Sequence, residues 1–212
     1  MVDLQADPIA EITRNGIVLE SGEHHELDVI VFATGYDAMT GPLLNLNIET
    51  PKASLKSYWE EGPRNYLGLA IPGFPNLFTI TGPGSPSVLS NMPVSIEQHV
   101  DWITECIAHC IKTGYTSIEA QEQSAEIWTD HVRETADATL LPKVQHSWYL
   151  GANIPGKPRV FMPYAGGLNM YRKICDNVAE EGYKGFDLNS GKELFSSKPL
   201  DSISSEGFLL GV

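Results

Sequence analysis

The sequence predicts an α/β fold, and three segments support that prediction. Residues 27–32 form a short run of apolar, mostly β-branched side chains that ends in the small-residue turn 33–35, which is typical of a buried strand. Residues 76–114 follow the order strand, turn, helix. Residues 116–142 continue with a second helical periodicity.

The N-terminal segment is expected to consist of β structure. A first strand is predicted around 16–19, followed by turn residues at 20–23. The apolar run 27–32 is then predicted to be a buried strand, and Thr34 and Gly35 to form a turn at its carboxyl end. Ligands of open α/β sheets bind beyond the carboxyl ends of strands, so this turn is a candidate nucleotide contact.

The second unit is predicted to contain a strand at 76–81, a Gly/Pro/Ser turn at 82–87, and a helix whose first turn holds Pro93. Five apolar residues recur there at helical spacing and predict the buried face of the helix. They are Ile96, Val100, Ile103, Ile107 and Ile111. Gly114 is expected to end the helix.

A second helix is predicted from Thr116, which stands in capping-box spacing with Glu119. Its buried stripe is expected at Ala125, Trp128, Val132 and Ala136. A short helix is predicted at 171–181, closed by Gly182. Residues 36–75 and 143–172 are expected to be irregular, and the chain from Asp187 onward to be a tail.

Composition excludes several classes of function. The 212 residues carry 27 acidic and 14 basic side chains, a net charge of −13, which argues against nucleic acid and anionic membranes as partners. No apolar run approaches the roughly 18 residues of a membrane span. Three cysteines without a CxxC pair give no disulfide framework, and we expect Cys106 and Cys110 to be small buried residues. A cytoplasmic protein is expected.

The short motifs taken singly are weak. His24 and His25 point to opposite faces of a strand, so no metal site is expected. Ser85 and Ser87 do not stand in GxSxG, which gives a hydrolase no support. The turn 82–92 is neither a Walker loop nor GxGxxG, but the helix after it offers free N–H groups that suit a negatively polarised ring edge.

Longer runs carry more weight. They are ATGYDAMTG at 33–41, EGPRNYLGL at 61–69, IPGFPNLFTITGPGSPSVLSNM at 71–92, SIEQHVDW at 95–102, SWYLGANIPGKPRVFMPYAGG at 147–167 and YRKICDNVAEEGYKGF at 171–186. Over roughly three quarters of the chain, the sequence resembles the C-terminal region of type I Baeyer–Villiger monooxygenases, the phenylacetone and cyclohexanone monooxygenase group.

The resemblance implies the C-terminal part of a flavoprotein with two dinucleotide-binding domains, including a helical segment and long irregular loops. Residues 1–33 would end the NADP-binding domain, and 34–188 would be the C-terminal part of the FAD-binding domain with substrate-pocket loops. Residues 189–212 would be a tail. FAD and NADPH would be cofactors of the full-length parent, which would insert one oxygen atom from O2 into a ketone and release an ester or lactone.

The resemblance also implies which residues form the site. Thr34, Gly35, Asn91, Met92 and Trp148 would contact cofactor, whereas Val88, Leu89, Met92 and Trp148 would line the substrate pocket. The catalytic Arg of the family, its two GxGxxG motifs and its FxGxxxHxxxW signature lie upstream of the matching region, so no catalytic residue is assigned to this chain.

Three hypotheses remain open at this point. The chain is part of a working monooxygenase, either truncated or paired with a separate N-terminal half. Alternatively it is a remnant or interaction module without catalysis. In the third hypothesis, the parent oxidises nitrogen or sulfur rather than a ketone.

Overall fold

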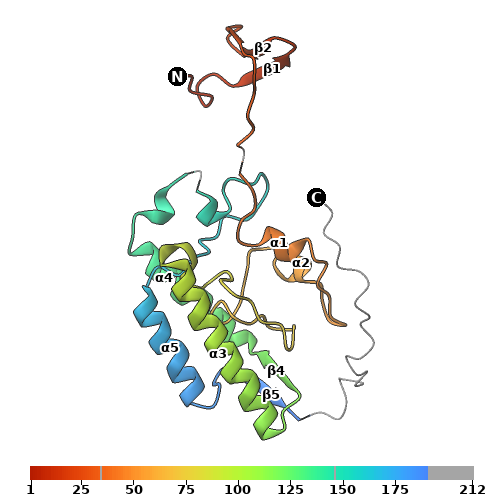
Figure 1. The fold of residues 1–212 in the computed structure, drawn as a ribbon, viewed down its shortest axis with the longest axis vertical. Helices are drawn as coiled ribbons and strands as arrows, with labels where there is room; N and C mark the ends of the chain where they lie inside the picture. The colour runs from red at the N-terminus through yellow and green to blue at the C-terminus, as the bar shows by residue number, and fades with distance from the viewer. Residues whose placement is uncertain (34, 146, 191–212) are drawn as a thin grey trace. The chain divides into compact units, whose positions relative to one another are not determined.

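The computed structural model describes residues 1–33, 35–145 and 147–190. The chain divides into two compact units, Met1–Gly35 and Tyr36–Val212, and each is described by itself (Figure 1). The first unit holds a small sheet, and the second holds the long helices and a two-stranded ribbon. The mixed α/β class predicted from the sequence is confirmed.

The first unit is an antiparallel sheet in the order β1-β2-β3, formed by Ile9–Thr13, Gly16–Leu19 and His24–Glu26. Strand β2 confirms the strand predicted at 16–19. The predicted turn after it is also present, because the Gly22 N–H donates to the Leu19 carbonyl at 2.9 Å. A side chain at Gly16 would place its Cβ 1.9 Å from the His25 carbonyl oxygen. The close approach of β3 to β2 therefore requires glycine at position 16.

The buried strand predicted at 27–32 is wrong for this structure. These residues are extended without a strand ladder among the described residues, and Val31 and Phe32 are 82% and 71% exposed. A buried strand needs neighbours on both sides to satisfy its N–H and C=O groups. The strands that the described chain offers are already paired with one another in short antiparallel sheets.

The second unit has three long helices, α3 (Met92–Thr113), α4 (Glu122–Asp137) and α5 (Leu168–Glu180). In Figure 1 α3 and α5 run side by side, and the ribbon of β4 (Ser117–Ala120) and β5 (Phe186–Asn189) lies beside the C-terminal end of α3. Its short elements are α1 (Gly41–Leu44), α2 (Leu55–Tyr58), and the 3-10 turns η1 (Ser87–Leu89), η2 (Leu141–Lys143) and η3 (Trp148–Leu150).

The main core lies between the three helices and the ribbon, and it is unusually aromatic. Trp102 of α3, Trp128 of α4 and Tyr171 of α5 are buried in it, and each donates a hydrogen bond to a main-chain carbonyl. Aromatic side chains bury large areas, and their polar atoms need a partner when they are buried. The Trp102 donor therefore joins α3 to α5, because Cys175 lies in α5, and the Trp128 and Tyr171 donors join α4 and α5 to the loops at Gly84 and Leu67.

The face of α3 that is buried differs from the predicted one. Ile96, Val100, Ile107 and Ile111 are between 37% and 75% exposed, and Ile103 is half-buried against the core. The buried positions are instead the more polar set Ser95, Gln98, His99, Trp102, Cys106 and Cys110. Both stripes have helical periodicity, so spacing alone could not show which one this chain covers.

Helix α4 follows the prediction. Its buried residues are Ala125, Trp128, Val132 and Ala136, the stripe expected from the sequence. It starts at Glu122, because the segment with the capping-box spacing at Thr116 and Glu119 is largely taken up by strand β4. There the chain pairs with β5, and that long-range ladder outweighs a local cap worth about 1 kcal/mol.

Two further boundaries differ from the sequence prediction. The strand predicted at 76–81 is reduced to an isolated bridge between Ala70 and Phe78. The tail expected from Asp187 begins with the pairing residues of β5. Residues 191–212, most of the predicted tail, lie outside the described residues. Helix α5 begins at Leu168, three residues before the predicted start, and Gly182 follows it at φ +72°.

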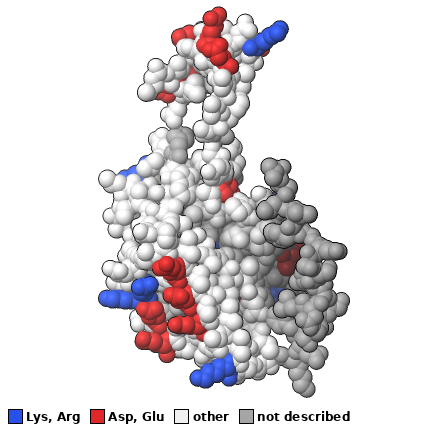
Figure 2. Space-filling view, in the orientation of Figure 1, with Lys and Arg blue, Asp and Glu red and all other residues white. Residues whose placement is uncertain are grey.

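The acidic charge is unevenly spread. Figure 2 shows acidic side chains gathered over α3 and α5, next to a broad uncharged surface. On α3 the exposed acidic residues include Glu97, Asp101 and Glu105, which lie next to the apolar stripe. Among the described residues, the helices are too short or too polar to cross a membrane.

Candidate functional site

The turn that leads into α3 is held from several sides. The Gly84 N–H donates to the Met162 carbonyl at 2.6 Å, and the Tyr164 N–H donates to the Ser85 carbonyl at 2.7 Å. Gly84 has φ +87°, and a Cβ there would lie 3.0 Å from the Trp128 indole nitrogen. The glycine therefore lets the turn approach α4 closely, with its backbone in a conformation that other residues rarely adopt.

The end of this turn is equally constrained. Ser87 is buried and adopts φ +44°, a left-handed conformation that costs energy for a residue with a Cβ. The Ser90 hydroxyl donates to the Ser87 carbonyl, and the hydroxyls of Ser90 and Ser95 are hydrogen-bonded to each other. These contacts fix η1 against the first turn of α3, and Val88 and Leu89 are held with it.

The N-terminus of α3 keeps donors available. Among the described residues Asn91 forms no side-chain cap, and Pro93 has no N–H of its own. The N–H groups of Met92 and Val94 lie in the first turn, where an α-helix has no internal acceptor for them. Since Asn91 is exposed and Met92 half-buried, this helix start is accessible to a bound acceptor.

The loop with Trp148 packs onto the turn. The Ser147 side chain caps η3, and the Trp148 and Tyr149 rings lie 4.5 Å apart in an edge-on arrangement. Leu89 packs into the same apolar cluster as Tyr149 and Leu150. The structure therefore brings one predicted pocket residue, Leu89, against the loop that carries another, Trp148.

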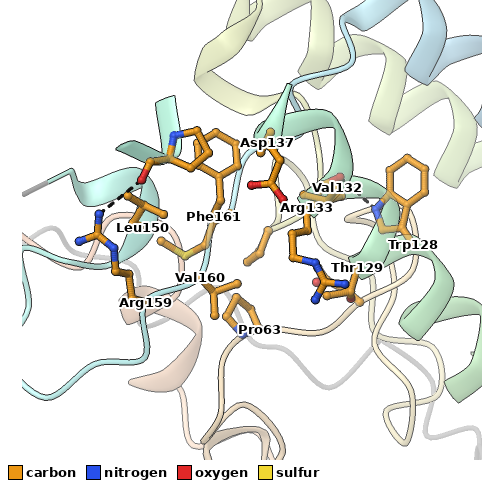
Figure 3. Close-up of a pocket in the computed structure, with 16 residues that line it drawn as sticks. Pro63, Trp128, Thr129, Val132, Arg133, Asp137, Leu150, Arg159, Val160 and Phe161 are labelled. Carbon is orange, nitrogen blue, oxygen red and sulfur yellow. Dashed lines mark hydrogen bonds between the residues drawn. The ribbon is translucent and has the colours of Figure 1, made fainter. Parts of the chain in front are cut away.

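A cavity of about 440 Å³ lies behind this pair of segments (Figure 3). One wall is the face of α4 with Trp128 and Val132, and the opposite wall includes Leu150 and Phe161. The turn contributes Gly84, whose carbonyl accepts from the Trp128 indole N–H at 3.1 Å. The turn and the loop thus share a hollow on the side of α4.

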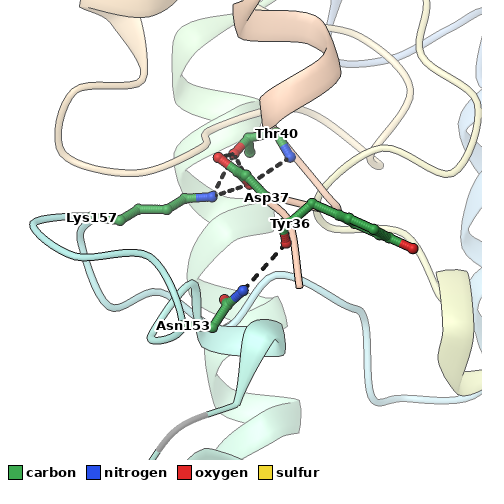
Figure 4. Close-up of polar contacts among 5 residues, drawn as sticks. All are labelled: Tyr36, Asp37, Thr40, Asn153 and Lys157. Atoms are coloured by element: carbon green, nitrogen blue, oxygen red, sulfur yellow. Dashed lines mark hydrogen bonds and ion pairs between the residues drawn. The ribbon is translucent and has the colours of Figure 1, made fainter. Parts of the chain in front are cut away.

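An ion pair joins the loop to the start of the second unit (Figure 4). The Lys157 ammonium lies 2.5 Å from the Asp37 carboxylate and 2.6 Å from the Thr40 hydroxyl, and the Asn153 amide donates to the Tyr36 carbonyl at 3.3 Å. Burial raises the pKa of Asp37, but the hydrogen bonds from Lys157 and Thr40 outweigh burial, so the carboxyl pKa is lowered. The Asp37 carboxyl is therefore ionised at neutral pH.

The same N-terminal segment also reaches the turn, because the Ser87 hydroxyl lies 3.8 Å from the sulfur of Met39. Three segments that are far apart in sequence, 36–40, 84–92 and 148–157, therefore meet. Of the predicted site residues, Val88, Leu89, Asn91, Met92 and Trp148 belong to this assembly. Thr34 lies outside the described residues, and Gly35, at φ +76°, belongs to the first unit.

Sequence reasoning missed the residues that hold the assembly together. Asp37 and Lys157 stand 120 positions apart, and neither lies in a recognisable motif. Their presence in two of the matching runs, ATGYDAMTG and IPGKP, was the available signal, but runs do not reveal pairing. Metal ligation is not indicated: no group of three or more His, Cys, Asp or Glu side chains is placed to hold an ion in the described parts of the chain.

Three relatives share this sequence over most of its length. A Baeyer–Villiger monooxygenase of Pseudooceanicola batsensis is 45% identical over 86% of the chain, and cyclohexanone 1,2-monooxygenase of an Acinetobacter species is 42% identical over 88%. Phenazine N-monooxygenase PhzNO1 of Lysobacter antibioticus is 40% identical over 90%. The chain spans 33%, 34% and 35% of these proteins, about a third of their length. No family model matches the chain.

The chain is similar to the C-terminal third of Baeyer–Villiger monooxygenases. Solved structures agree with the sequence relatives. A steroid monooxygenase bound to NADP is 49% identical with a TM-score of 0.78, over 90% of this chain and 35% of its own. A closed cyclohexanone monooxygenase is 40% identical with a TM-score of 0.85 over the same shares. The OTEMO complex with FAD and NADP is 34% identical with a TM-score of 0.81, over 89% and 34%. The resemblance predicted from the sequence is confirmed.

The accessible start of α3 fits a flavin of this monooxygenase family. A cofactor edge rich in acceptor atoms needs donors, and the first-turn N–H groups of Met92 and Val94 supply them without a competing side-chain cap among the described residues. The partial positive charge of a 22-residue helix adds to the same preference.

Proposed function

We propose that this chain forms the substrate-pocket wall and flavin-edge helix of a FAD- and NADPH-dependent monooxygenase. The whole enzyme would insert one oxygen atom from O2 into a ketone and release an ester or lactone. The observation that carries the proposal is the assembly of the turn 82–92 with the Trp148 loop, in a chain that matches ketone monooxygenases over nearly nine tenths of its length.

In this proposal each segment has one task. Asn91 and Met92 place the start of α3 against the flavin ring, and bound FAD supplies the oxygen chemistry. Val88, Leu89 and Trp148 form an apolar wall that orients the ketone and excludes water. Gly35 and Thr34 are proposed cofactor contacts from the first unit.

The ion pair between Lys157 and Asp37 acts through the loop rather than on substrate. It anchors the loop next to the Tyr36–Thr40 segment, and so limits how far Trp148 travels. Positioning of this kind contributes to catalysis by holding reacting groups in a productive geometry.

A chimera tests the proposal. The C-terminal third of the Acinetobacter cyclohexanone 1,2-monooxygenase is replaced by residues 1–190 of this chain, and the purified protein is examined for bound flavin, NADPH oxidation and lactone formed from cyclohexanone. We expect a yellow protein that forms lactone. Trp148→Ala should lower turnover at least tenfold, whereas Trp59→Phe, in a separate apolar cluster, should leave it within twofold.

The alternative hypothesis of a remnant or interaction module predicts another result. A folded chimera that binds no flavin, or binds flavin and forms no oxygenated product from any ketone tested, would overturn the proposal. Circular dichroism of the chimera establishes folding first, so that lost activity is not confused with lost structure.

A second candidate, N-oxidation of a heteroaromatic substrate, is favoured by one observation, the 40% identity to phenazine N-monooxygenase PhzNO1. The same chimera separates the two candidates when it is offered cyclohexanone and phenazine in parallel. Phenazine N-oxide without lactone would support N-oxidation, and lactone without N-oxide would support the ketone reaction.

A further inference from the structure

Helix α3 contacts both ends of the turn that precedes it. The chain enters the turn 82–91 from Thr81, and α3 begins directly after the turn. The His99 ring, about two helical turns from the start of α3, accepts a hydrogen bond from the Thr81 N–H through Nδ1 at 3.0 Å. At the other end, the hydroxyls of Ser90 and Ser95 are hydrogen-bonded to each other. The helix therefore closes the turn into a loop.

The turn has a constrained base and an accessible tip. Thr81 adopts φ +54°, a left-handed conformation that is uncommon for a residue with a Cβ. At Gly82 a Cβ would lie 2.7 Å from the Gly68 carbonyl oxygen. Residues 82–87 are buried, whereas Val88 at the tip is 36% exposed. A changed backbone angle at the base would therefore move the tip, because the buried residues between them have little room to adapt.

The His99 ring is neutral and held in one orientation. It is fully buried, and burial lowers its pKa to about 4, so the ring carries no charge at pH 7. Because Nδ1 accepts a hydrogen bond, the proton of the neutral ring lies on Nε2. The Tyr171 ring of α5 packs edge-on against the imidazole, with the ring centroids 5.5 Å apart. One tautomer of the ring therefore faces Thr81.

Packing alone does not explain a histidine at this position. The His99 Nε2 is buried without a hydrogen-bond partner among the described residues. A buried polar atom in that state lowers stability, whereas an apolar side chain of similar size would fill the space without this cost. The hydrogen bond that the ring does form is the one from the Thr81 N–H. The turn, rather than the core, therefore accounts for the imidazole.

We propose that His99 is a positioning residue whose imidazole fixes the start of the turn, and thereby the place of Val88 and Leu89 at its tip. The inference rests on the proposed function, because it concerns the wall that orients the ketone. His99 acts through the turn and touches neither ketone nor cofactor. An unsymmetrical ketone lies against the wall in either of two orientations, and a displaced wall changes the share of each.

The ratio of two isomeric products is the readout in the chimera with the Acinetobacter enzyme. A single enantiomer of 3-methylcyclohexanone yields two lactones, because its methyl group lies nearer one of the two carbons that flank the carbonyl. Unfolded protein forms no product, so the ratio is independent of the folded fraction. We expect His99→Leu to change the ratio by roughly threefold or more. His99→Asn, whose Oδ1 replaces Nδ1 as acceptor, should keep it within about 1.5-fold.

Cys106→Ala is the matched control. Cys106 is also fully buried on the inner face of α3, and it lies nearly two helical turns beyond His99. Its truncation should lower the melting temperature and leave the lactone ratio within about 1.5-fold. If Cys106→Ala changes the ratio as much as His99→Leu does, general loosening of α3 sets the ratio, and the inference is wrong.

A second measurement needs no cofactor. Amide hydrogen exchange in the 212-residue chain is followed by NMR at Thr81, Gly84 and Leu89, whose N–H groups are all hydrogen-bonded. His99→Leu should speed exchange at these amides about tenfold relative to those of α4, and His99→Asn should restore it. The imidazole nitrogen shifts of the unmodified chain should place the proton on Nε2, and this measurement does not depend on the folding of any variant.

The two measurements separate this inference from the proposed function. An unmodified chimera that forms no lactone contradicts the proposed function, whereas the exchange rates still decide whether His99 holds the turn. Where lactone is formed, an unchanged ratio in His99→Leu, or a changed ratio that His99→Asn does not restore, would overturn the inference. With or without lactone, equal acceleration of exchange in the turn and in α4, or an imidazole proton on Nδ1, would also overturn it.

Discussion

Helices α3 and α4 are both amphipathic, but they differ in which face is buried: α4 buries its apolar stripe, and α3 leaves its apolar stripe largely exposed. Helix α4 buries the apolar stripe that its sequence displays, and its partners are residues of the same chain. Helix α3 buries a mixed face with Gln98, His99 and Trp102, and turns four branched aliphatic residues outward. Helix α4 is thus covered by residues of this chain, whereas helix α3 presents an apolar surface that stays exposed among the described residues, of the kind that marks an interface.

The chain spans about a third of the length of its relatives. Helix α4 belongs to a core that is formed by described residues of this chain. Helix α3 has one face in that core, and its second face stays exposed among the described residues, which we interpret as a surface for a partner. The largest mutational effects should therefore occur on α4 and on the inner face of α3.

The largest effect is expected from Trp128→Ala on α4. The ring stacks on Tyr164 at 5.2 Å and donates to the Gly84 carbonyl, so truncation leaves a cavity and an unmet acceptor. Losses of about 3–5 kcal/mol are typical of such substitutions. Urea unfolding of the chain measures the loss, and a value below 1 kcal/mol would show that α4 does not anchor the core.

The next effect concerns the inner face of α3 and depends on pH. Burial lowers the pKa of His99 to about 4 from its usual 6.5, and its Nδ1 accepts from the Thr81 N–H. The unfolded chain binds a proton near pH 6.5 whereas the folded chain does not until about pH 4. This contribution to stability is therefore fully present above pH 6.5 and is lost as the pH falls toward 4, by on the order of 3 kcal/mol.

Unfolding free energies from pH 4 to 8 check this expectation, with His99→Gln as the comparison because it lacks the titrating ring. The difference in slope between the two proteins should lie between pH 4 and 6.5. Parallel curves would mean that His99 is not held neutral, and the inner face of α3 would then be less tightly covered than described.

Helices α3 and α4 also differ in how much of their structure the sequence predicts. Periodicity located α3, α4 and α5, and for α4 it also gave the buried face, because a single apolar stripe was present. For α3 two stripes competed, and the choice between them depends on partners that spacing does not reveal. The strand at 27–32 was misplaced for the same reason, since its composition indicates burial but the described chain offers no sheet for it.

The candidate site, too, could be predicted from the sequence only in part. The resemblance supplied Met92, Leu89 and Trp148, and the structure adds how their segments are joined. The ion pair between Asp37 and Lys157 joins residues that stand 120 positions apart in the sequence. Such pairings follow from the tertiary structure, and a local motif carries no record of them.

A smaller effect tests whether packing on α4 alone holds the Trp148 loop. Lys157→Met removes the ion pair with Asp37 and should cost about 1 kcal/mol, because both side chains are partly exposed. Hydrogen exchange should quicken in residues 148–160 and stay unchanged in α4. In the unmodified chain the contribution of Asp37 is present above its ordinary pKa of 3.8 and is lost as pH falls through the lowered value.

An unchanged exchange rate in residues 148–160 would show that the ion pair between Lys157 and Asp37 does not hold the loop. Packing against α4 would then hold it alone. Lys56→Met serves as the control for loss of a positive charge, because Lys56 lines a second hollow of the unit together with Asp37 and Lys157.

The smallest effect is expected on the outer face of α3. Ile107→Ser should change the stability of the isolated chain by about 0.5 kcal/mol or less, since the side chain is 44% exposed. In the chimera with the Acinetobacter enzyme the same substitution should lower the melting temperature by several degrees. Equal effects in both proteins would contradict an interface on this face and remove the contrast with α4.

The three cysteines of the core allow opening of the core to be measured by thiol labelling. Cys106 and Cys110 of α3 and Cys175 of α5 are buried and reduced in the described structure, and burial raises the pKa of each thiol, that of Cys175 to about 12. A thiol reagent reacts with thiolate, so labelling requires the core to open and expose these thiols first. The labelling rate therefore measures how often the core opens. Binding of a partner to the outer face of α3 should lower this rate.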